Sequence, residues 1–477
     1  MAFSRIFLWL GYAAIFYAGL MLFTAASGLV LGELSVATIF VGLALLLSLA
    51  GLVIVFTSQN APLKESTRDV LVFLVLFWTI MPLVAAIPFS MLDTSLNWVG
   101  AYFESVSAIT TTGASIIIPE EVPKTLILWR SVLQWSGGCI VATFAVVLLA
   151  ALNLSGTGVH KSIFFTLQKG ELFSRLVGVG RIIAALYATF ASICFFFLVL
   201  FGTPVFEALC LSLSGISTGG LTPRSGVLES YVSNSAGIVL AITCLFGAAN
   251  VSILWDFIRR RNRSTFREMF YNVEHRGTFV ILAILFLTGF FFLGHMHFHT
   301  VLVESAFMAS TAGFDYHVFG VDMISPSILI TFALVGGSAL STAGGIKIIR
   351  LLLLLRHLRT DLDRMSHPSR VMPVQFQGRK IEDRAFLSIW MYFFGYTLVF
   401  AIGMVALGAT GLEFSHAVSA SASALSNMGP LLNATYPEIT YAEMNPLTQG
   451  VLIVVMLFGR IEVLAAFAAL SPSQWRR

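Results

Sequence analysis

Residues 97–115 read NWVGAYFESVSAITTTGAS, an apolar stretch too short to cross a bilayer that ends in a cluster of small residues. The same plan returns as TPVFEALCLSLSGISTGG at 203–220, FHTVLVESAFMASTAGF at 298–314 and GLEFSHAVSASASALSNMGP at 411–430. Each stretch stands between two longer apolar runs. A fourfold internal repeat of this kind predicts pseudosymmetry about a central axis. Each stretch predicts a short re-entrant helix followed by an extended loop, and non-helical backbone at membrane depth is tolerated only beside a polar path.

The composition places most of the chain in lipid. Of its 477 residues, 57% are hydrophobic and only 11% are charged, and the mean hydropathy is +0.89. A water-soluble domain carries more than twice that charge density, so soluble classes of protein are excluded. About ten apolar runs have the roughly 20 residues that a spanning helix needs. They lie at about 6–30, 36–57, 70–92, 126–152, 181–202, 233–258, 277–295, 325–355, 385–408 and 447–470.

The predicted fold is therefore an all-α polytopic membrane protein with about ten transmembrane helices and four re-entrant pore helices. The first run follows Arg5 and could be a secretory signal peptide. It extends past 20 residues and a second run follows at once, which favours a retained helical hairpin. The predicted domains are a hairpin at 1–62 and pore modules at 63–155, 156–262, 263–370 and 371–477, the third holding an intramembrane gating loop.

Charge placement predicts the orientation. Lys and Arg gather around 64–68, 160–181, 259–267 and 356–384 and at the end of the chain, whereas acidic residues lie in the intervening loops. By the positive-inside rule the basic loops and both termini are cytoplasmic. The net charge of +4 gives no reason to expect nucleic acid as a partner.

The four small-residue clusters offer rings of backbone carbonyls and hydroxyls without a shared carboxylate or imidazole. Neutral oxygen dipoles in this arrangement suit a dehydrated monovalent cation. Glycine permits the backbone angles that aligned carbonyls require. Close helix packing is the alternative reading of small residues, but four matching clusters favour a filter. The predicted ion-binding residues are Thr111, Thr112, Gly113, Ser217, Thr218, Gly219, Thr311, Ala312, Gly313, Asn427, Met428 and Gly429.

Motifs along nearly the whole chain carry a family resemblance. They are Ile87-Pro88-Phe89, Trp129-Arg130-Ser131, Gln134-Trp135-Ser136-Gly137-Gly138, Gly247-Ala248-Ala249-Asn250, Gly336-Gly337-Ser338, Gly344-Gly345-Ile346-Lys347 and Gly459-Arg460-Ile461-Glu462. With the filter clusters, they make the chain resemble the membrane subunits of bacterial Trk-type potassium uptake systems, the TrkH/TrkG family, in the superfamily of Ktr and the plant high-affinity transporters.

The resemblance implies four M1-pore helix-M2 modules around one path, a homodimer with two separate pores in the bacterial inner membrane, and potassium as the transported ion. It also implies a cytosolic, TrkA-like regulatory ring that binds nucleotide. This chain carries no phosphate-cradling glycine motif, so we expect no cofactor here and nucleotide only on the partner. In the superfamily a serine at the first filter glycine goes with sodium permeation. Gly113, Gly219, Gly313 and Gly429 favour potassium, while Ala312 and Met428 suggest only moderate selectivity.

Two features predict a gate. The eighth apolar run is interrupted by glycine and serine, which do not favour a continuous helix. A kink at a helix crossing is one reading of this run, and an intramembrane loop beneath the filter is the reading that the resemblance implies. Arg460, with Glu462 nearby, lies inside the last run, where a charge is costly and functional by default. The predicted gating residues are Gly336, Gly337, Ser338, Ser341, Thr342, Gly344, Gly345, Lys347 and Arg460.

For Arg460 the alternative is a structural ion pair with Glu462, and for Lys347 it is snorkelling to the cytoplasm. His295, His297 and His299 form the one candidate metal cluster, but alternate residues on a helix end do not converge and no transition-metal site is predicted. The runs hold almost no ionisable residues apart from Arg460 and Glu462, which argues against an intramembrane enzyme. A proton- or sodium-coupled symporter, or a less selective transporter of K+ and Na+, stays open beside gated potassium permeation.

Overall fold

The computed structural model of the protein describes residues 3–59, 67–93, 95–151, 172–260, 271–292, 297–317, 325–367, 375–376, 379–380 and 383–461. Almost all of this part of the chain is helical, which confirms the predicted all-α class. The strands described are the short antiparallel pair β1 (Gln375–Phe376) and β2 (Arg379–Lys380). The four predicted boundaries between modules fall outside the described residues, so these boundaries stay a prediction.

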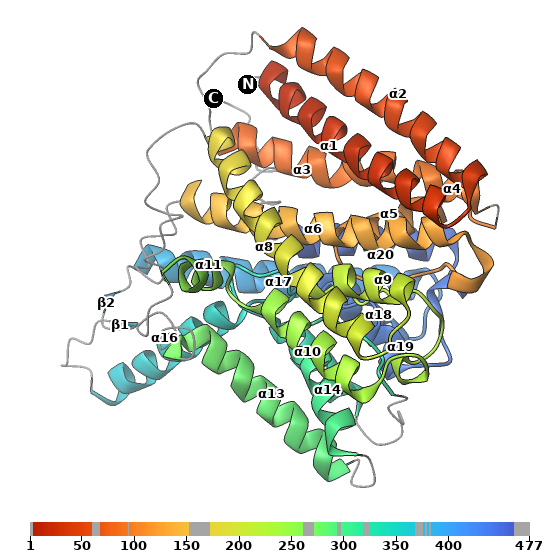
Figure 1. The fold of residues 1–477 in the computed structure, drawn as a ribbon. Helices are drawn as coiled ribbons and strands as arrows, with labels where there is room; N and C mark the ends of the chain where they lie inside the picture. The colour runs from red at the N-terminus through yellow and green to blue at the C-terminus, as the bar shows by residue number, and fades with distance from the viewer. Residues whose placement is uncertain are drawn as a thin grey trace.

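The N-terminal hairpin consists of α1 (Phe3–Val30) and α2 (Leu34–Ser58), which lie side by side along one edge of the molecule (Figure 1). Gly32 adopts a φ of +78° in the turn between them. In the same turn Glu33 accepts hydrogen bonds from the backbone N–H groups of Lys124 and Thr125, both at 2.9 Å. The hairpin therefore caps the start of a helix in the first repeat, since the first N–H groups of a helix have no partner within it.

Four groups of helices follow the hairpin. The first contains α3 (Thr67–Ala85), α4 (Ile87–Leu92), α5 (Trp98–Ile109), η1 (Pro119–Glu121) and α6 (Lys124–Ala151). The second contains α8 (Leu172–Leu200), α9 (Val205–Ile216), η3 (Leu228–Ser230), α10 (Asn234–Ala248) and α11 (Val251–Arg260). The third contains α13 (Val273–Phe292), α14 (Phe298–Ala309), α15 (Pro326–Val335) and α16 (Ile348–Ser366). The fourth contains α17 (Asp383–Ala409), α18 (Phe414–Leu425), α19 (Leu431–Thr435), η4 (Tyr441–Glu443) and α20 (Pro446–Arg460).

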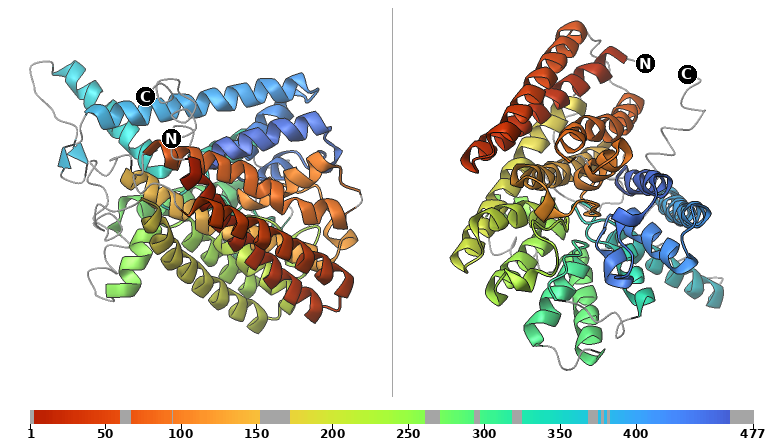
Figure 2. Two further views of the ribbon diagram at one scale, coloured as in Figure 1. Left: turned by 90° about the horizontal axis from the view of Figure 1, so that it is seen from above. Right: turned by 90° about the vertical axis from the view of Figure 1, so that its right-hand side faces the viewer.

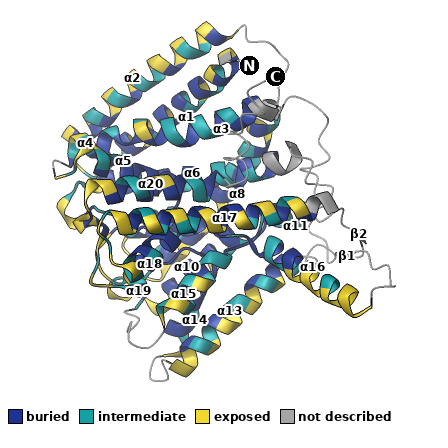
Figure 3. Ribbon diagram, turned by 180° about the vertical axis from the view of Figure 1, so that it is seen from behind, coloured by how far each residue is buried: buried dark blue, intermediate teal, exposed yellow. Residues whose placement is uncertain are grey.

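These groups surround a common centre. In the right-hand view of Figure 2 the colours follow one another around the molecule from orange through green to blue, with the hairpin outside. Burial agrees with this arrangement (Figure 3). In the most apolar window of α6, 78% of the residues are buried, against 17% for α2. Helix α6 therefore lies in the middle of the bundle, while α2 presents an apolar face suited to lipid.

Seven of the predicted runs are helical segments long and apolar enough to cross a membrane in the described chain, with α3 and α4 counted as one segment, and the other three depart from a simple crossing helix. The run at 233–258 bends by 102° between α10 and α11. The run at 325–355 is divided into α15 and α16 by the irregular residues 336–347. The last run is described only as far as residue 461. The predicted short stretches are confirmed as helices α5, α9, α14 and α18, each 12 residues long.

Candidate functional site

The four 12-residue helices end in the same way. The second residue after each helix has a left-handed backbone, with φ of 51° at Thr111, 52° at Thr218, 57° at Thr311 and 50° at Asn427. The next N–H then bonds back to a carbonyl five residues earlier, at 2.8, 2.9, 3.0 and 3.0 Å in chain order. This is the 6→1 hydrogen bond that terminates many helices. We call residues 110–113, 217–220, 310–313 and 426–429 the filter segments.

The left-handed residues are unusual because three are β-branched, and an L-residue pays about 1–2 kcal/mol for this conformation. The described chain has one further non-glycine residue with positive φ, which is Lys347 at 76°. All five therefore lie among the predicted filter and gating residues. Backbone outliers of this kind persist only where the surrounding structure imposes them, and they concentrate at functional sites.

The filter glycines are not all equivalent. Gly113 and Gly313 have φ of 81° and 67°, as the prediction of glycine-specific angles requires, whereas Gly429 has no positive φ and the prediction is wrong for it. In the second segment the hydrogen-bond pattern puts Gly220, with φ of 75°, in the corresponding position. Gly219 instead corresponds to Thr112, because its N–H makes the five-residue bond back to Ser214. The sequence motif contains two consecutive glycines, so the sequence alone could not set this register.

The segments meet in chain order to close a ring. A Cβ on Gly113 would collide with the carbonyl oxygen of Gly219, and a Cβ on Gly220 would collide with that of Ala312. A Cβ on Gly313 would stand 3.1 Å from the side chain of Met428. The ring closes where the Gly429 N–H donates to the Thr112 carbonyl at 2.5 Å. All twelve predicted ion-binding residues are thus brought together from segments about one hundred residues apart.

Glycines on the following long helices let those helices approach the ring. A Cβ at Gly137 of α6, Gly247 of α10 or Gly459 of α20 would strike the carbonyl at the end of the preceding short helix. The carbonyls concerned belong to Ile109, Ile216 and Leu425. The same contact in three groups of helices fixes these three glycines as equivalent positions. This close approach is how small residues bring helix backbones together in membranes.

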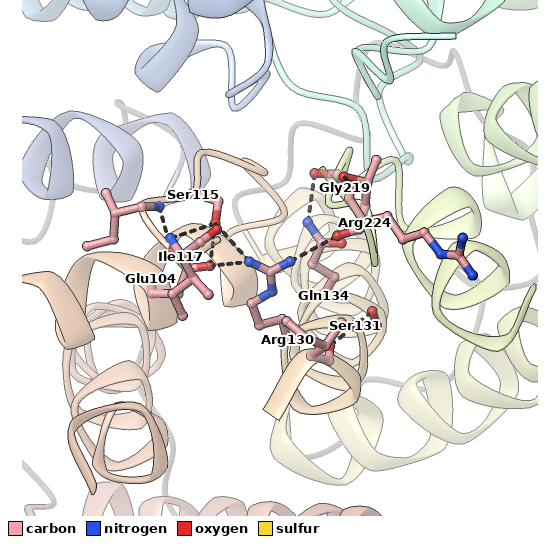
Figure 4. A network of polar contacts seen from close by, with 11 residues as sticks. Glu104, Ser115, Ile117, Arg130, Ser131, Gln134, Gly219 and Arg224 are labelled. Atoms are coloured by element: carbon pink, nitrogen blue, oxygen red, sulfur yellow. Dashed lines mark hydrogen bonds and ion pairs between the residues drawn. The ribbon is translucent and has the colours of Figure 1, made fainter. Parts of the chain in front are cut away.

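A buried polar network supports the first segment (Figure 4). Arg130 of α6 forms an ion pair with Glu104 of α5 at 3.0 Å and also donates to the Thr222 carbonyl at 2.9 Å. Glu104 accepts the N–H of Ile116 at 3.1 Å. Arg130 is thus a buried charge within a predicted span, in addition to Arg460, and the expectation of almost no others was incomplete. Its pairing partner lies 26 residues away in the sequence, which explains why sequence patterns did not reveal it.

The irregular residues 336–347, here called the gate loop, lie against the filter segments. Thr218 Oγ1 donates to Thr342 Oγ1 at 3.1 Å, and Gly344 N–H donates to Thr311 Oγ1 at 2.9 Å. A Cβ on Gly344 would collide with the Ser426 carbonyl. The loop therefore touches the second, third and fourth filter segments. The prediction of a loop adjacent to the filter agrees with these contacts, and the alternative of a simple kink does not.

Arg460 connects the gate loop to the first filter segment. Its guanidinium donates to the Thr342 carbonyl at 2.5 Å, to the Thr110 carbonyl, and to the hydroxyl of Thr111. The side chain is 8% exposed. A buried charge that is held by carbonyl dipoles occupies the kind of position that a cation would otherwise fill. The predicted alternative partner, Glu462, lies outside the described residues.

Lys347 points into the protein instead of snorkelling to the cytoplasm. Its Nζ atom donates to the Ser341 carbonyl at 3.3 Å and to the Ala343 carbonyl. On the far side of the loop, the buried carboxylate of Glu274 accepts the Ala339 N–H at 2.9 Å. The amide of Asn250, at the bend between α10 and α11, lies 3.4 Å from that carboxylate. Sequence patterns missed Glu274, although Asn250 belongs to one of the quoted motifs.

Two cavities of very different size flank the filter segments. The larger cavity, here called the vestibule, has a volume of about 720 Å³ and is lined by Gly113, Gly220 and Pro430 together with the loops that follow the filter segments. A second cavity, lined by the gate loop, Lys347, Arg460 and Trp78, has a volume of only about 30 Å³. This is about the share of one water molecule in the liquid. The described structure is therefore open on the vestibule side and nearly filled at the gate loop.

The carboxylates around the vestibule differ in their hydrogen-bond partners and in the direction in which their pKa is shifted. Hydrogen bonds from Ser225 lower the pKa of Glu120, which lies in the loop after the first segment. Burial raises the pKa of Asp315 to about 7. Arg224 donates to Glu207, and His317 is paired with Glu229. The vestibule thus contains both signs of charge, and Asp315 is a group whose ionisation changes near neutral pH.

The structure describes two of the three histidines of the candidate metal cluster, His297 and His299. The rings of His297 and His299 stack with centroids 5.5 Å apart, and His295 lies outside the described chain. No group of three or more His, Cys, Asp or Glu side chains capable of holding a metal occurs in the part that the structure describes.

Comparison with known proteins gives consistent matches. A family model described as "TrkH: Cation transport protein" matches residues 36–475. The Trk system potassium uptake protein TrkH of Vibrio parahaemolyticus is 30% identical over 434 residues, covering 88% of this chain and 89% of that protein. The corresponding protein of Salmonella typhimurium is 27% identical and covers 98% of both chains. TrkG of Escherichia coli is 28% identical over 433 residues, covering 88% of both chains. The crystal structure of the potassium transporter TrkH from Vibrio parahaemolyticus superposes with a TM-score of 0.88 over 100% of both chains, at 28% identity.

Proposed function

Because this chain belongs to the TrkH family of cation transport proteins, we propose that it takes up potassium through the ring of four filter segments. One observation carries the proposal. Four helices of equal length end in the same left-handed turn and deliver neutral oxygens to a closed ring between the vestibule and the gate loop. The relatives named as potassium uptake proteins cover nearly the whole chain and support potassium as the cargo. A ring of this kind has no nucleophile or general base in common, and the protein is a transporter rather than an enzyme.

The ion would exchange its water for carbonyl and hydroxyl oxygens in the filter. The ligands we assign are the twelve filter residues predicted from the sequence, with Gly220 added in the position that corresponds to Gly113. The four segments differ in their side chains, since Ala312 and Met428 stand where Thr112 carries a hydroxyl. The binding sites are accordingly less regular than those of a symmetric channel.

The gate in this proposal is the loop 336–347 together with Arg460. Its contacts with all four filter segments, direct or through Arg460, support this role. Movement of the loop would free the filter oxygens and widen the cavity of about 30 Å³. Glycines at 336 and 345, with φ of 76° and 75°, give the loop backbone angles that other residues resist. Lys347 adds a second positive charge that would repel a cation until the loop moves.

Coupled transport is the second candidate. A proton- or sodium-coupled symporter would use the same ring and would need a titratable group near the path. Glu274 is a described carboxylate that contacts the gate loop and favours this candidate. Channel-like permeation needs no such group, and it is the mechanism that we propose.

The remaining assignments concern the surroundings of the chain. We place it in the bacterial inner membrane with both termini in the cytoplasm, following the distribution of basic loops. We also propose a homodimer and a cytosolic regulatory ring that binds nucleotide, because the relatives are named as parts of a Trk system.

Cation flux into liposomes containing the purified full chain tests the proposal. The experiment compares potassium, rubidium and sodium gradients with and without a pH gradient, for the natural chain and for Arg460→Ala. Potassium and rubidium flux that exceeds sodium flux and ignores the pH gradient supports channel-like permeation. Flux that requires a proton or sodium gradient supports the coupled candidate. If Arg460→Ala is folded and carries no potassium even with the cytosolic fraction of its source present, the proposal is wrong.

A further inference from the structure

A side chain outside the filter holds one of the filter carbonyls. Gln134 lies on α6, in the first group of helices, and its Nε2 atom donates to the carbonyl oxygen of Gly219 in the second filter segment at 2.7 Å. Figure 4 shows the amide reaching across from α6 to this carbonyl. Gln134 has no exposed surface. The contact therefore joins two groups of helices within the protein interior, at the level of the filter.

Gly219 and Gln134 fit each other sterically as well. A Cβ on Gly219 would lie 2.5 Å from Nε2 and 2.6 Å from Oε1 of Gln134, inside the closest real contacts. Glycine at 219 is thus explained by the amide that occupies this space, since its φ is not in the left-handed region. The second glycine of the pair, Gly220, has the left-handed angle. The two consecutive glycines serve different purposes.

The equivalent positions in other helices carry no amide. Gly137, Gly247 and Gly459 make the same contact with the ends of their short helices, so the residues three positions earlier are also equivalent. These residues are Gln134, Cys244 and Met456. All three are buried, but only Gln134 offers a strong hydrogen-bond donor. The amide contact consequently breaks the fourfold pattern at one carbonyl of the ring.

The chemistry of Gln134 suggests a role other than stability. Its Oε1 atom is buried and has no hydrogen-bond partner among the described residues. Burial of an unsatisfied polar atom is unfavourable, and an apolar side chain of the same size avoids it. A residue kept only for packing at this position would not need an amide. The donor to Gly219 is the interaction that distinguishes Gln134 from Met or Leu.

We propose that Gln134 is a positioning residue for ion selection, because its hydrogen bond fixes the direction and position of the Gly219 carbonyl in the filter ring. This inference rests on the proposed function of that ring. Selectivity among cations depends on the number and geometry of the oxygens that replace hydration water. A carbonyl that is held from outside the ring cannot move inward to contract around a smaller ion. Gln134 therefore favours potassium over sodium.

The test replaces the amide while keeping the shape of the side chain. Gln134→Met has the same length and no donor, and Gln134→Leu provides a second apolar variant. Cys244→Ala, at the equivalent position of α10, is the matched control that removes a side chain without removing an amide. Potassium and sodium fluxes are measured in liposomes with the full chain, and thermal unfolding of each purified variant is measured in detergent.

We expect both Gln134 variants to unfold at or above the temperature of the natural chain. Their ratio of potassium to sodium flux should fall about three- to tenfold, the factor typical of one hydrogen bond. Cys244→Ala should retain the natural ratio. Gly113→Ser is measured in parallel because it tests the filter assignment itself.

Different failures have different meanings. If Gly113→Ser lowers the ratio and the Gln134 variants do not, the filter stands and the role of Gln134 is wrong. If none of the variants changes the ratio, the filter assignment is wrong. A higher total flux at constant ratio would place Gln134 in gating, and loss of folded protein in both Gln134 variants would make it structural; either result overturns the proposal.

Discussion

The first and third groups of helices each place a buried glutamate at the same position of the short helix, but they differ in what pairs with that glutamate and in the helix that follows. Glu104 and Glu304 are both the seventh residue of a 12-residue helix. Each is buried and each accepts a backbone N–H from the residue twelve positions later, Ile116 or Tyr316. In the first group Arg130 pairs with the carboxylate, and α6 continues unbroken for 28 residues. In the third group no cation pairs with Glu304 within the described residues, and the following helix is divided by the gate loop.

The unbroken helix of the first group and the divided helix of the third group suit different roles, namely support of the filter and movement of a gate. The first group contributes two buried side chains from a continuous helix: Gln134, which holds the Gly219 carbonyl of the filter, and Arg130, which holds the Thr222 carbonyl just after the second filter segment. The third group contributes the gate loop, which contacts the second and third filter segments through hydrogen bonds that involve the hydroxyls of Thr218 and Thr311. A continuous helix cannot move a few residues independently, whereas a loop with glycines at both ends can. In the proposed mechanism, the same repeated unit thus provides a rigid wall in the first group and a movable gate in the third.

The largest expected effect is a loss of stability when the ion pair between Arg130 and Glu104 in the first group is removed. Arg130→Ala leaves Glu104 as an uncompensated buried charge and should destabilise the protein by about 3–5 kcal/mol. Glu304→Gln retains an oxygen that can accept the N–H groups of Tyr316 and His317, both of which bond to a single Glu304 oxygen. The substitution loses only the charge of the acceptor, so its cost should be about 1–2 kcal/mol. Thermal or denaturant unfolding in detergent measures both. Equal losses in the two variants would contradict the difference drawn between the groups.

The second prediction concerns the movable element. Arg460→Ala removes charge-assisted hydrogen bonds between the first filter segment and the gate loop, each worth about 1.5–3 kcal/mol. Basal potassium flux in liposomes should rise about ten- to hundredfold, and deletion of residues 337–344 should raise it further. Arg359→Ala, on the exposed side of α16, is the control and should leave flux unchanged. Low flux from a folded Arg460→Ala protein would show that this contact does not close the path.

The third prediction compares two filter glycines. At Gly113 a side chain would meet the backbone of Gly219, whereas at Gly313 it would meet the flexible side chain of Met428. Gly113→Ser should therefore lower the ratio of potassium to sodium flux about tenfold, since strain of about 1–2 kcal/mol falls on the ring itself. Gly313→Ser should lower the ratio less. The reverse order would mean that the contacts of the added Cβ do not govern selectivity.

The smallest expected effect depends on pH. Asp315 corresponds to Ser115 of the first group, and burial raises its pKa to about 7. It is neutral below that pH and ionised above it, so a change in external pH from 8 to 6 removes a negative charge from the vestibule. The other charged or titratable groups that line the vestibule are Arg130, Arg224, His317, Tyr441 and Glu443. Potassium flux at low ionic strength should fall by about a factor of two, through the lower local cation concentration.

Asp315→Asn should abolish this part of the pH dependence and leave flux near the value of the natural chain at pH 6. Raising the ionic strength should reduce the effect in the natural chain, because salt screens the charge. An Asp315→Asn variant with unchanged pH dependence would assign the titration to another group, with His317 the next to test.

Much of the architecture could be predicted from the sequence because lipid limits the choice of structure. An apolar run of about 20 residues must form a helix that satisfies its own backbone. A run of half that length followed by small residues must turn back. The apolar parts of the first and third short stretches, which precede the small-residue clusters, consequently form the helices α5 and α14. The gate loop was predictable for the same reason, since glycine and serine interrupt an otherwise long helix.

Local patterns could not give the partners of buried polar groups. Gln134 and Gly219 are 85 residues apart, and Arg460 and Thr110 are 350 apart. Neither spacing corresponds to a helical or strand period. The register of the second filter segment was also hidden, because Gly219 and Gly220 are identical in sequence and differ only in backbone angle and neighbours.

The sequence by itself determined the helical type of the elements, the four short helices with their small-residue clusters and the charge asymmetry of the loops. These properties follow from local composition, since transfer of each segment between water and lipid is decided by its own residues. Only the tertiary structure decided which oxygens come together in the ring and which of these oxygens Gln134 and Arg460 hold. It also decided that Arg130 pairs with Glu104 and that Lys347 turns inward. Those choices depend on packing between distant segments, where a buried polar group must find whichever partner the fold places within hydrogen-bonding distance.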